Sequence, residues 1–198
     1  MNDKLKITKR QKEIIVGKLL GNGHAETVSG KTYRLKFEHS YSEMCYVDWL
    51  YQELLDLASA KPKIQTQKVN DKEYQKYWFN TKYSGSFRFY GQQFYPNGQK
   101  VVPKLIHRWL TPMALAVWFM DDGLIKSKEC QETILNTQSF NSIELKRLQE
   151  AIKRNFDIET TLKKHKEGKQ IYFPTSETVK LRKIIDQYVL PSMKYKLG

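Results

Sequence analysis

The sequence predicts an α+β fold in which two halves of similar organisation follow one another. Residues 14–23, Ile-Ile-Val-Gly-Lys-Leu-Leu-Gly-Asn-Gly, and residues 111–123, Thr-Pro-Met-Ala-Leu-Ala-Val-Trp-Phe-Met-Asp-Asp-Gly, each indicate an apolar helix that ends in a short polar residue and a glycine. Hairpins and amphipathic helices follow both stretches in the same order. With 198 residues, 40% of them hydrophobic, the chain suits one domain or two tightly fused halves with a substantial core.

The charge balance indicates a polyanionic partner. Lys and Arg number 34 against 21 Asp and Glu, a formal net charge of +13. Nucleic acid is the simplest partner for such an excess, although a basic protein that binds no polyanion is the alternative. We expect no membrane association, because no helix carries a concentrated basic face and no apolar run could span a bilayer.

The two cysteines, Cys45 and Cys130, lack zinc-ligand spacing with any histidine. Free thiols in a reducing compartment are the simplest interpretation. Residues 1–12 contain no apolar signal segment, so we expect an intracellular protein of an organelle, a bacterium or a phage.

The first half shows clear periodicity. Tyr33, Leu35 and Phe37 alternate with polar residues, as in a half-buried strand. Turn-forming residues separate the expected elements. These are a helix over 8–20, strands over 25–28 and 33–38, a helix over 41–57, a hairpin of 63–69 with 73–81, and a short aromatic helix within 84–95.

Two glycines predict that the apolar helices pack closely. Gly17 and Gly21 are four residues apart and share a helix face. Each costs roughly 1 kcal/mol of helix stability relative to alanine, which a close helix–helix contact would offset. We expect this face to meet Ala114, Val117 and Asp121, with the C-terminal ends of both helices side by side. A frayed helix end is the alternative.

The hairpin over residues 63–81 is rich in side chains that suit base edges. Glutamine recognises adenine and lysine recognises guanine in the major groove of DNA. An ordinary solvated hairpin face is the alternative. The residues concerned are Lys63, Gln65, Gln67, Lys68, Gln75 and Lys76.

Residues 96–104 form the expected linker between an N-terminal half, residues 1–95, and a C-terminal half, residues 105–198. In the second half, Thr161, Lys163 and His165 alternate with an apolar residue and so share the polar face of a strand. The expected elements there are a strand over 133–138, a helix over 141–155, a hairpin of 159–164 with 170–173, and a helix over 176–188.

Asp121 and Asp122 end the central apolar helix, where the partial negative charge of a helix C-terminus makes acids unfavourable. Their position therefore predicts a nearby cation. An Asp-Gly turn after a core helix explains the same residues without one.

Taken together, these motifs resemble the LAGLIDADG homing endonucleases of the single-chain, two-motif type. The signature stretches are Ile15-Val-Gly-Lys-Leu-Leu-Gly-Asn-Gly23 and Leu115-Ala-Val-Trp-Phe-Met-Asp-Asp-Gly123. The flanking Leu110-Thr-Pro-Met, Gly30-Lys-Thr-Tyr33, Leu135-Asn-Thr-Gln-Ser-Phe140 and Met193-Lys-Tyr-Lys-Leu197 are most similar to the I-SceI (omega) subgroup.

The resemblance implies a monomer of two αββαββα halves related by a pseudo-two-fold axis. The signature helices would form the interface, and two antiparallel sheets would form a saddle over a long, asymmetric double-stranded DNA site. It implies hydrolysis of one phosphodiester in each strand across the minor groove, leaving 3′ overhangs, and no small-molecule cofactor.

The resemblance also assigns the site. It implies that Asn22 and Asp122 bind Mg²⁺, which Mn²⁺ or Ca²⁺ can replace for binding, with main-chain carbonyls of Gly21 and Asp121 as further ligands. Lys100 and Lys196 would act on the reacting phosphate, although plain phosphate contact is the alternative for both. The other expected DNA-contacting residues, besides those of the 63–81 hairpin, are Arg34, Lys36, Glu38, Asn136, Gln138, Thr161, Lys163, His165 and Tyr172.

Asn22 departs from the family pattern, which has an aspartate at this position. An amide retains a ligating oxygen but carries no negative charge, so we expect weak double-strand cleavage with DNA binding preserved. The sequence leaves open whether this asparagine was introduced or arose naturally. Competing interpretations are a DNA-binding protein or RNA-binding intron maturase of the same fold, and a basic structural protein.

Overall fold

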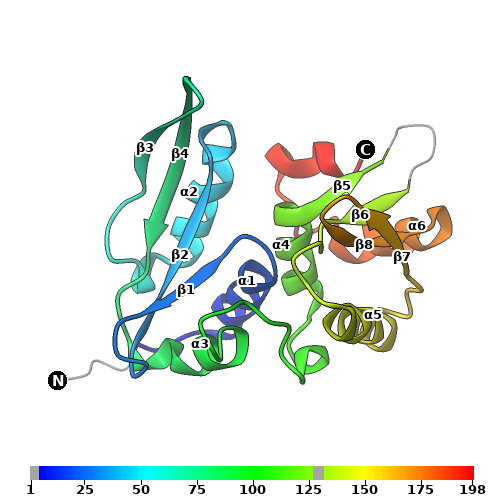
Figure 1. Ribbon diagram of the computed structural model, residues 1–198, viewed down its shortest axis with the longest axis horizontal. Helices are drawn as coiled ribbons and strands as arrows, with labels where there is room; N and C mark the ends of the chain where they lie inside the picture. The colour runs from blue at the N-terminus through cyan, green and yellow to red at the C-terminus, as the bar shows by residue number, and fades with distance from the viewer. Residues whose placement is uncertain (1–4, 127–131) are drawn as a thin grey trace.

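The computed structural model describes residues 5–126 and 132–198, and in them two four-stranded antiparallel sheets flank a central pair of helices (Figure 1). The first set of elements is α1 (Lys9–Leu20), β1 (His24–Thr27), β2 (Tyr33–Ser40), α2 (Met44–Glu53), β3 (Lys63–Val69), β4 (Lys72–Asn80) and α3 (Arg88–Phe94). The second is α4 (Pro112–Asp122), β5 (Gly123–Ile125), β6 (Thr133–Leu135), α5 (Ser142–Phe156), β7 (Thr161–His165), β8 (Gly168–Phe173) and α6 (Thr175–Ile185).

The two sheets have equivalent strand orders, β1-β2-β4-β3 and β5-β6-β8-β7. Both sets therefore read αββαββα, which confirms the expected fold class and the repeat between the halves. Five short 3₁₀ helices complete the described chain: η1 (Tyr41–Glu43), η2 (Leu55–Leu57), η3 (Gly85–Phe87), η4 (Ile106–Arg108) and η5 (Pro191–Lys196). No helix among the described residues has the length and apolar character needed to cross a bilayer.

Side-chain caps fix where the main helices begin. Thr8 and Gln11 form a capping box at the start of α1, and Asn141 and Glu144 form another at the start of α5. At α4, the Thr111 hydroxyl accepts a hydrogen bond from the Ala114 amide, and proline occupies the first turn. These caps satisfy amides that a helix leaves unpaired, so helix starts could be read from the sequence to within a residue.

The helix pair α1 and α4 forms the centre of the molecule. A Cβ atom built on Gly17 would lie 2.5 Å from the Ala114 carbonyl oxygen and 2.7 Å from Val117 Cβ, and one on Gly21 would lie 2.5 Å from Asp121 Cβ. Real Cβ atoms do not approach so closely, so glycine is required at both positions. The predicted packing face is confirmed, and both helices are buried over most of their length.

Strand β2 shows why one face of each sheet is covered and the other open. Tyr33, Leu35 and Phe37 are buried, and the residues between them are partly exposed, as the alternation predicted. Helix α2 packs against β2 and β4, and α6 packs against β8. The uncovered faces of the two sheets provide the surfaces on which a ligand could lie.

Several boundaries differ from the sequence-based expectation. The helix expected over 41–57 is interrupted, with α2 between η1 and η2, and strand β5 was not anticipated because it begins directly at the end of α4. Strand β6 ends at Leu135 because the Thr137 hydroxyl takes over the hydrogen bonds to the Lys169 carbonyl and the Ile171 amide. Strand β7 begins at Thr161, since the Glu159 amide is bonded to the Glu177 carboxylate.

The described residues include one of the two cysteines. Cys45 is exposed on α2. Cys130 lies outside the described residues. The expectation of free thiols in a reducing compartment therefore stays a prediction.

We predict that Gly17→Ala destabilises the protein by about 1–3 kcal/mol despite the higher helix propensity of alanine, because the added methyl group overpacks the α1–α4 contact. Chemical denaturation followed by circular dichroism measures the change. Gly85→Ala is the matched control, because a Cβ there meets no atom within 4 Å. A Gly17→Ala protein as stable as the parent would contradict the inferred close contact.

Candidate active site and nucleic-acid interface

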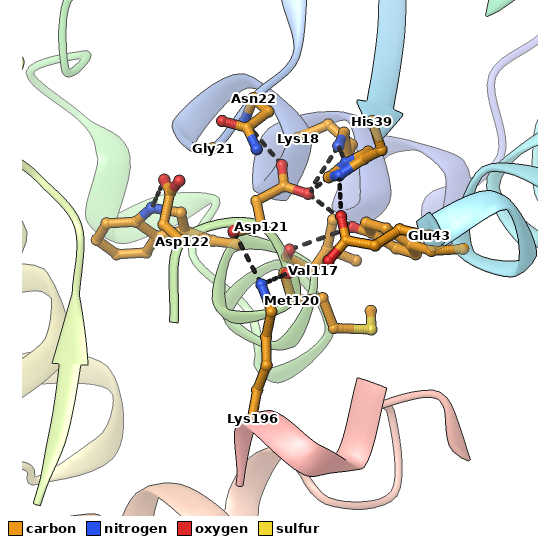
Figure 2. Close-up of polar contacts among 12 residues, drawn as sticks. Lys18, Gly21, Asn22, His39, Glu43, Val117, Met120, Asp121, Asp122 and Lys196 are labelled. Atoms are coloured by element: carbon orange, nitrogen blue, oxygen red, sulfur yellow. Dashed lines mark hydrogen bonds and ion pairs between the residues drawn. The ribbon is translucent and has the colours of Figure 1, made fainter. Parts of the chain in front are cut away.

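The C-terminal ends of α1 and α4 lie side by side and define the candidate active site (Figure 2). Leu20 and Asp122 end the two helices, and the residues after Leu20 are Gly21 and Asn22. The main-chain N–H of Asn22 donates a 2.8 Å hydrogen bond to Asp121 Oδ2, which joins the two helix ends directly. Asn22 and Asp122 line one pocket of about 610 Å³, together with Gly21 and Lys100.

Asp121 is buried and neutralised from within the protein. Its Oδ1 accepts hydrogen bonds from Lys18 Nζ at 2.7 Å and from the Tyr46 hydroxyl at 3.0 Å. The side chains of Lys18 and Asp121 are both 0% exposed. Burial alone would raise the pKa of Asp121, but the Lys18 charge and its hydrogen bonds hold that pKa well below its usual value.

Lys18 therefore supplies the cation that Asp121 requires, and the sequence-based reasoning did not identify it. The sequence did contain a signal for this role: Lys18 lies inside an apolar helix, one turn before Gly21, which faces Asp121. His39 completes this buried cluster, with Nε2 2.8 Å from Lys18 Nζ. An ammonium group can only donate, so Nε2 accepts and Nδ1–H donates to Glu43 at 2.9 Å.

Asp122 has a different environment from its neighbour. Its carboxylate is partly exposed, and the Trp118 indole N–H donates to its Oδ2 at 3.2 Å. Burial, reinforced by the Asp121 charge, raises the pKa of Asp122 to about 7. The carboxylate thus faces the pocket without an ion-pair partner among the described residues, as a metal ligand would.

Two lysines make similar contacts with the two helix ends. Lys196 Nζ donates to the carbonyls of Met120 at 2.5 Å and Asp121 at 3.1 Å (Figure 2). Lys100 Nζ donates to the Gly21 carbonyl. Burial lowers the pKa of Lys100 to about 8, although Asp122 and Asp121 oppose this change. Lys100, in the linker, therefore contacts the end of α1, and Lys196 contacts the end of α4.

The oxygen donors at this site fit a hard divalent cation. Asp122, Asn22 and Gly21 line the pocket and offer a carboxylate, an amide oxygen and a carbonyl oxygen. The Asp121 carbonyl accepts from Lys196, and neither of these residues lines that pocket. Such ligands suit Mg²⁺, which retains waters and binds few protein groups. Within residues 5–126 and 132–198, no three His, Cys, Asp or Glu side chains gather to hold a metal.

The register of the first sheet shows which predicted residues share its open face. Paired residues of adjacent strands point to the same side, as Lys36 with Asn80 and Glu38 with Trp78. Glu38 contacts Lys36 at 2.6 Å and Lys76 at 2.9 Å, so part of the basic charge there is neutralised. The predicted residues on this face are Arg34, Lys36, Glu38, Lys63, Gln65, Gln67 and Lys76.

Lys68 and Gln75 lie on the other face of this hairpin. Gln75 pairs with Thr66, and Lys68 pairs with Glu73. These pairs alternate along the strands with the open-face pairs, so their side chains point to the opposite side of the sheet. Lys68 also forms an exposed ion pair with Glu73 at 3.4 Å. The composition-based grouping of the hairpin residues did not separate its two faces, and these two leave the proposed DNA-facing set.

In the second sheet, Thr161, Lys163 and His165 share the open face with Tyr172, as the alternation of β7 predicted. Lys163 Nζ lies 3.2 Å from the centroid of the Tyr172 ring.

Asn136 and Gln138 lie beside this sheet, at the edge of the pocket. Asn136 Oδ1 accepts hydrogen bonds from Gln138 at 3.3 Å and Gln170 at 2.7 Å. Gln170, which the sequence-based prediction omitted, alternates with buried Ile171 in β8 and was identifiable from that pattern.

Comparisons with known proteins agree with this arrangement. A profile of the LAGLIDADG DNA endonuclease family matches residues 12–181. DNA endonuclease I-ChuI of Chlamydomonas applanata is 30% identical over 212 residues, which cover 98% of this chain and 97% of that protein. Cytochrome b mRNA maturase bI2 of Saccharomyces cerevisiae is 35% identical over 201 residues, which cover 93% of this chain and 46% of the maturase.

A solved structure, the homing endonuclease I-WcaI bound to its DNA recognition sequence, has the same fold. Its TM-score is 0.91 at 23% sequence identity, and the match covers 98% of this chain and 88% of that chain.

We predict that Lys18→Met lowers the free energy of unfolding by about 3–5 kcal/mol, because it leaves the buried Asp121 carboxylate unpaired. Adding Asp121→Asn should recover part of this loss, since an amide needs no counter-ion. Lys68→Met is the control, because its ion pair is exposed and such pairs contribute about 0–1 kcal/mol. Denaturant titration compares the four proteins, and an equal cost for Lys18→Met and Lys68→Met would be inconsistent with the buried pair.

Proposed function

From the premise that this chain belongs to the LAGLIDADG DNA endonuclease family, we propose that it is a site-specific endonuclease of double-stranded DNA. The observation that carries the proposal is the meeting of two helix ends at a pocket that contains Asp122, the Gly21 carbonyl and Lys100. This pocket lies between two sheets whose open faces carry basic and amide side chains. A hydrolytic centre between two base-reading surfaces is the arrangement that sequence-specific cleavage requires.

In the proposed reaction, Asp122 and the Gly21 carbonyl would hold Mg²⁺, which when bound would supply an activated water and stabilise charge on the leaving oxygen. Lys100 stabilises the negative charge that develops on the phosphate or orders the attacking water. Structures of I-DmoI, a homing endonuclease of similar fold with a TM-score of 0.51, in complex with DNA and Mn and with DNA and Ca, support the use of a divalent metal.

The second proposed centre combines Asn22 with Lys196 and the Asp121 carbonyl. Asn22 lacks the negative charge that would attract a divalent cation and accept a proton from water. We therefore infer that this centre is slower than the one containing Asp122, so that nicking precedes or replaces double-strand cleavage. DNA affinity would be preserved, because Asn22 lies outside both sheets.

The proposed substrate is a long, asymmetric duplex bound by a monomer, with the two sheets reading opposite ends of the site. The open faces differ in their residues: Lys36, Lys63, Lys76 and Glu38 lie on the first, whereas Thr161, Lys163, His165 and Gln170 lie on the second. Cleavage across the minor groove with 3′ overhangs, and action inside an organelle, complete the proposal. The proposal also includes the division of the chain into two halves, residues 1–95 and 105–198, joined by a linker over residues 96–104.

A second candidate function is RNA splicing as an intron maturase. The relative in Saccharomyces cerevisiae is named a cytochrome b mRNA maturase, and a second relative of the same name in Debaryomyces hansenii is 33% identical over 97% of this chain. Pure RNA binding does not require the Asp122 carboxylate. Asp122→Ala should therefore leave maturase activity intact while it abolishes DNA cleavage.

We predict that Asn22→Asp accelerates cutting of a cognate duplex by at least about tenfold, because it restores an anionic metal ligand. The duplex is first selected from a random library by binding, and end-labelled strands then report each cut in Mg²⁺. Asp122→Ala is expected to abolish the faster cut with duplex affinity unchanged. Equal cutting rates for the parent and Asn22→Asp would sink the inferred impairment.

We predict that Lys63→Ala weakens duplex binding and reduces the salt slope, d log K/d log[salt], by about 1, because one phosphate contact is lost. Lys68→Ala, on the opposite face of the same hairpin, removes the same charge and should leave the slope unchanged. Fluorescence anisotropy titrations over a salt series give both values. Equal effects of the two substitutions would contradict the proposed DNA-facing surface.

A further inference from the structure

We propose that a glutamate from each half positions the active-site lysine that contacts the helix end of the other half: Glu43 positions Lys196, and Glu144 positions Lys100. We call these two sets of contacts the reciprocal braces. The inference rests on the proposed function, because it assigns a role in strand cleavage to two glutamates that lie outside the proposed metal site and outside both sheets.

The first brace begins at the C-terminal segment that carries Lys196. This residue is the last of the short helix η5, which is anchored by the buried side chains of Met193 and Leu197. Tyr195, its neighbour, is 63% exposed, yet its hydroxyl donates to Glu43 Oε1 at 3.0 Å, across 152 residues of sequence. The segment that positions Lys196 is therefore tied to the opposite half.

Packing alone does not hold η5 against the first half. A groove of about 410 Å³ lies between them, lined by Glu43, Tyr46, Ser192 and Tyr195 among others. Glu43 and Tyr195, which share the hydrogen bond, both line this groove. Loss of that bond would let the segment shift without a compensating change in apolar contact.

Glu43 is itself held in place from the helix interface. Its Oε2 accepts from His39 Nδ1 at 2.9 Å, and His39 Nε2 accepts from Lys18 Nζ, which also donates to Asp121 Oδ1 at 2.7 Å (Figure 2). The main-chain carbonyl of the same Asp121 accepts from Lys196 Nζ at 3.1 Å. The contacts thus form a closed loop, in which the helix interface and Lys196 hold each other in position.

In the second brace, a glutamate of the second half holds the chain segment that carries Lys100. Glu144 Oε1 accepts from the Val102 amide at 3.0 Å, and Arg147 donates to the Val102 carbonyl at 3.0 Å, two residues after Lys100. Glu43 directly precedes α2, and Glu144 lies in the first turn of α5, the equivalent helix of the other half. The pseudo-symmetric placement of both glutamates argues against two unrelated surface contacts.

Strand-resolved cleavage tests the braces. In the Asn22→Asp chain, Lys196→Met and Lys100→Met first identify the strand that depends on each lysine. Tyr195→Phe and Glu43→Ala should then slow the Lys196-dependent strand by roughly tenfold, because a small misplacement of a reacting group is costly, and leave the other strand unchanged. Glu144→Ala should give the reverse pattern, with duplex affinity constant in every variant. Glu43→Gln retains an acceptor for Tyr195 and should restore most of the rate.

Lys194→Met is the matched control for the first brace. It removes a 3.0 Å ion pair from the same segment, but the partner Asp186 belongs to the same half. Both strands should be cut at the parental rates. Equal slowing of both strands by Tyr195→Phe, or a strand bias with Lys194→Met, would overturn the positioning role.

A measurement without DNA separates the braces from the proposed function. Acetic anhydride labelling with mass spectrometry gives the acetylation rate of each lysine in the free protein. Lys196 should react several-fold faster in Tyr195→Phe with Lys100 unchanged, and Glu144→Ala should show the converse. If these rates change but no duplex is cut, the endonuclease proposal fails and the contacts stand. If they do not change, the braces are wrong whatever the cleavage result.

Discussion

The close contact between α1 and α4 is the constraint on which the rest of the structure depends. Gly17 and Gly21 have no side chains that would separate the helices. The helix ends therefore meet, and the main-chain N–H of Asn22 donates a hydrogen bond to the Asp121 carboxylate. This approach also places Lys18 against Asp121 in a space closed to water. The two halves therefore share one buried ion pair and one pocket, and neither half could form the site alone.

The two adjacent aspartates of α4 illustrate how environment assigns different roles to identical side chains. Asp121 is buried and fully hydrogen-bonded, and a neighbouring ammonium group keeps it ionised. Asp122 faces the pocket, and burial raises its pKa towards neutrality. The first residue stabilises the interface, while the second has the unsatisfied charge that suits a metal ligand. A cation in the pocket would favour the ionised form of Asp122, so metal and carboxylate would stabilise each other.

Asymmetry extends from this interface to the whole molecule. Lys18 has no charged counterpart in the second half, where tryptophan occupies the equivalent helix position, and Asn22 is matched by Asp122. The open face of the first sheet is strongly charged, whereas that of the second carries amides and a tyrosine covered by Lys163. A repeated fold with unequal surfaces suits an asymmetric duplex better than a palindromic one, and unequal centres suit sequential cutting of the two strands.

The sequence by itself determined the class of fold, most of the order of the elements, the face of the α1–α4 contact and the starts of the capped helices α1, α4 and α5. These features depend on local periodicity, capping residues and glycine spacing, all of which act over a few residues. Only the tertiary structure decided that Lys18 neutralises Asp121, that Lys68 and Gln75 lie on the other face of their hairpin, and that Glu43 reaches Tyr195. Two of those relationships join residues 103 and 152 positions apart, which no local pattern places side by side, and the third depends on the strand register of the hairpin.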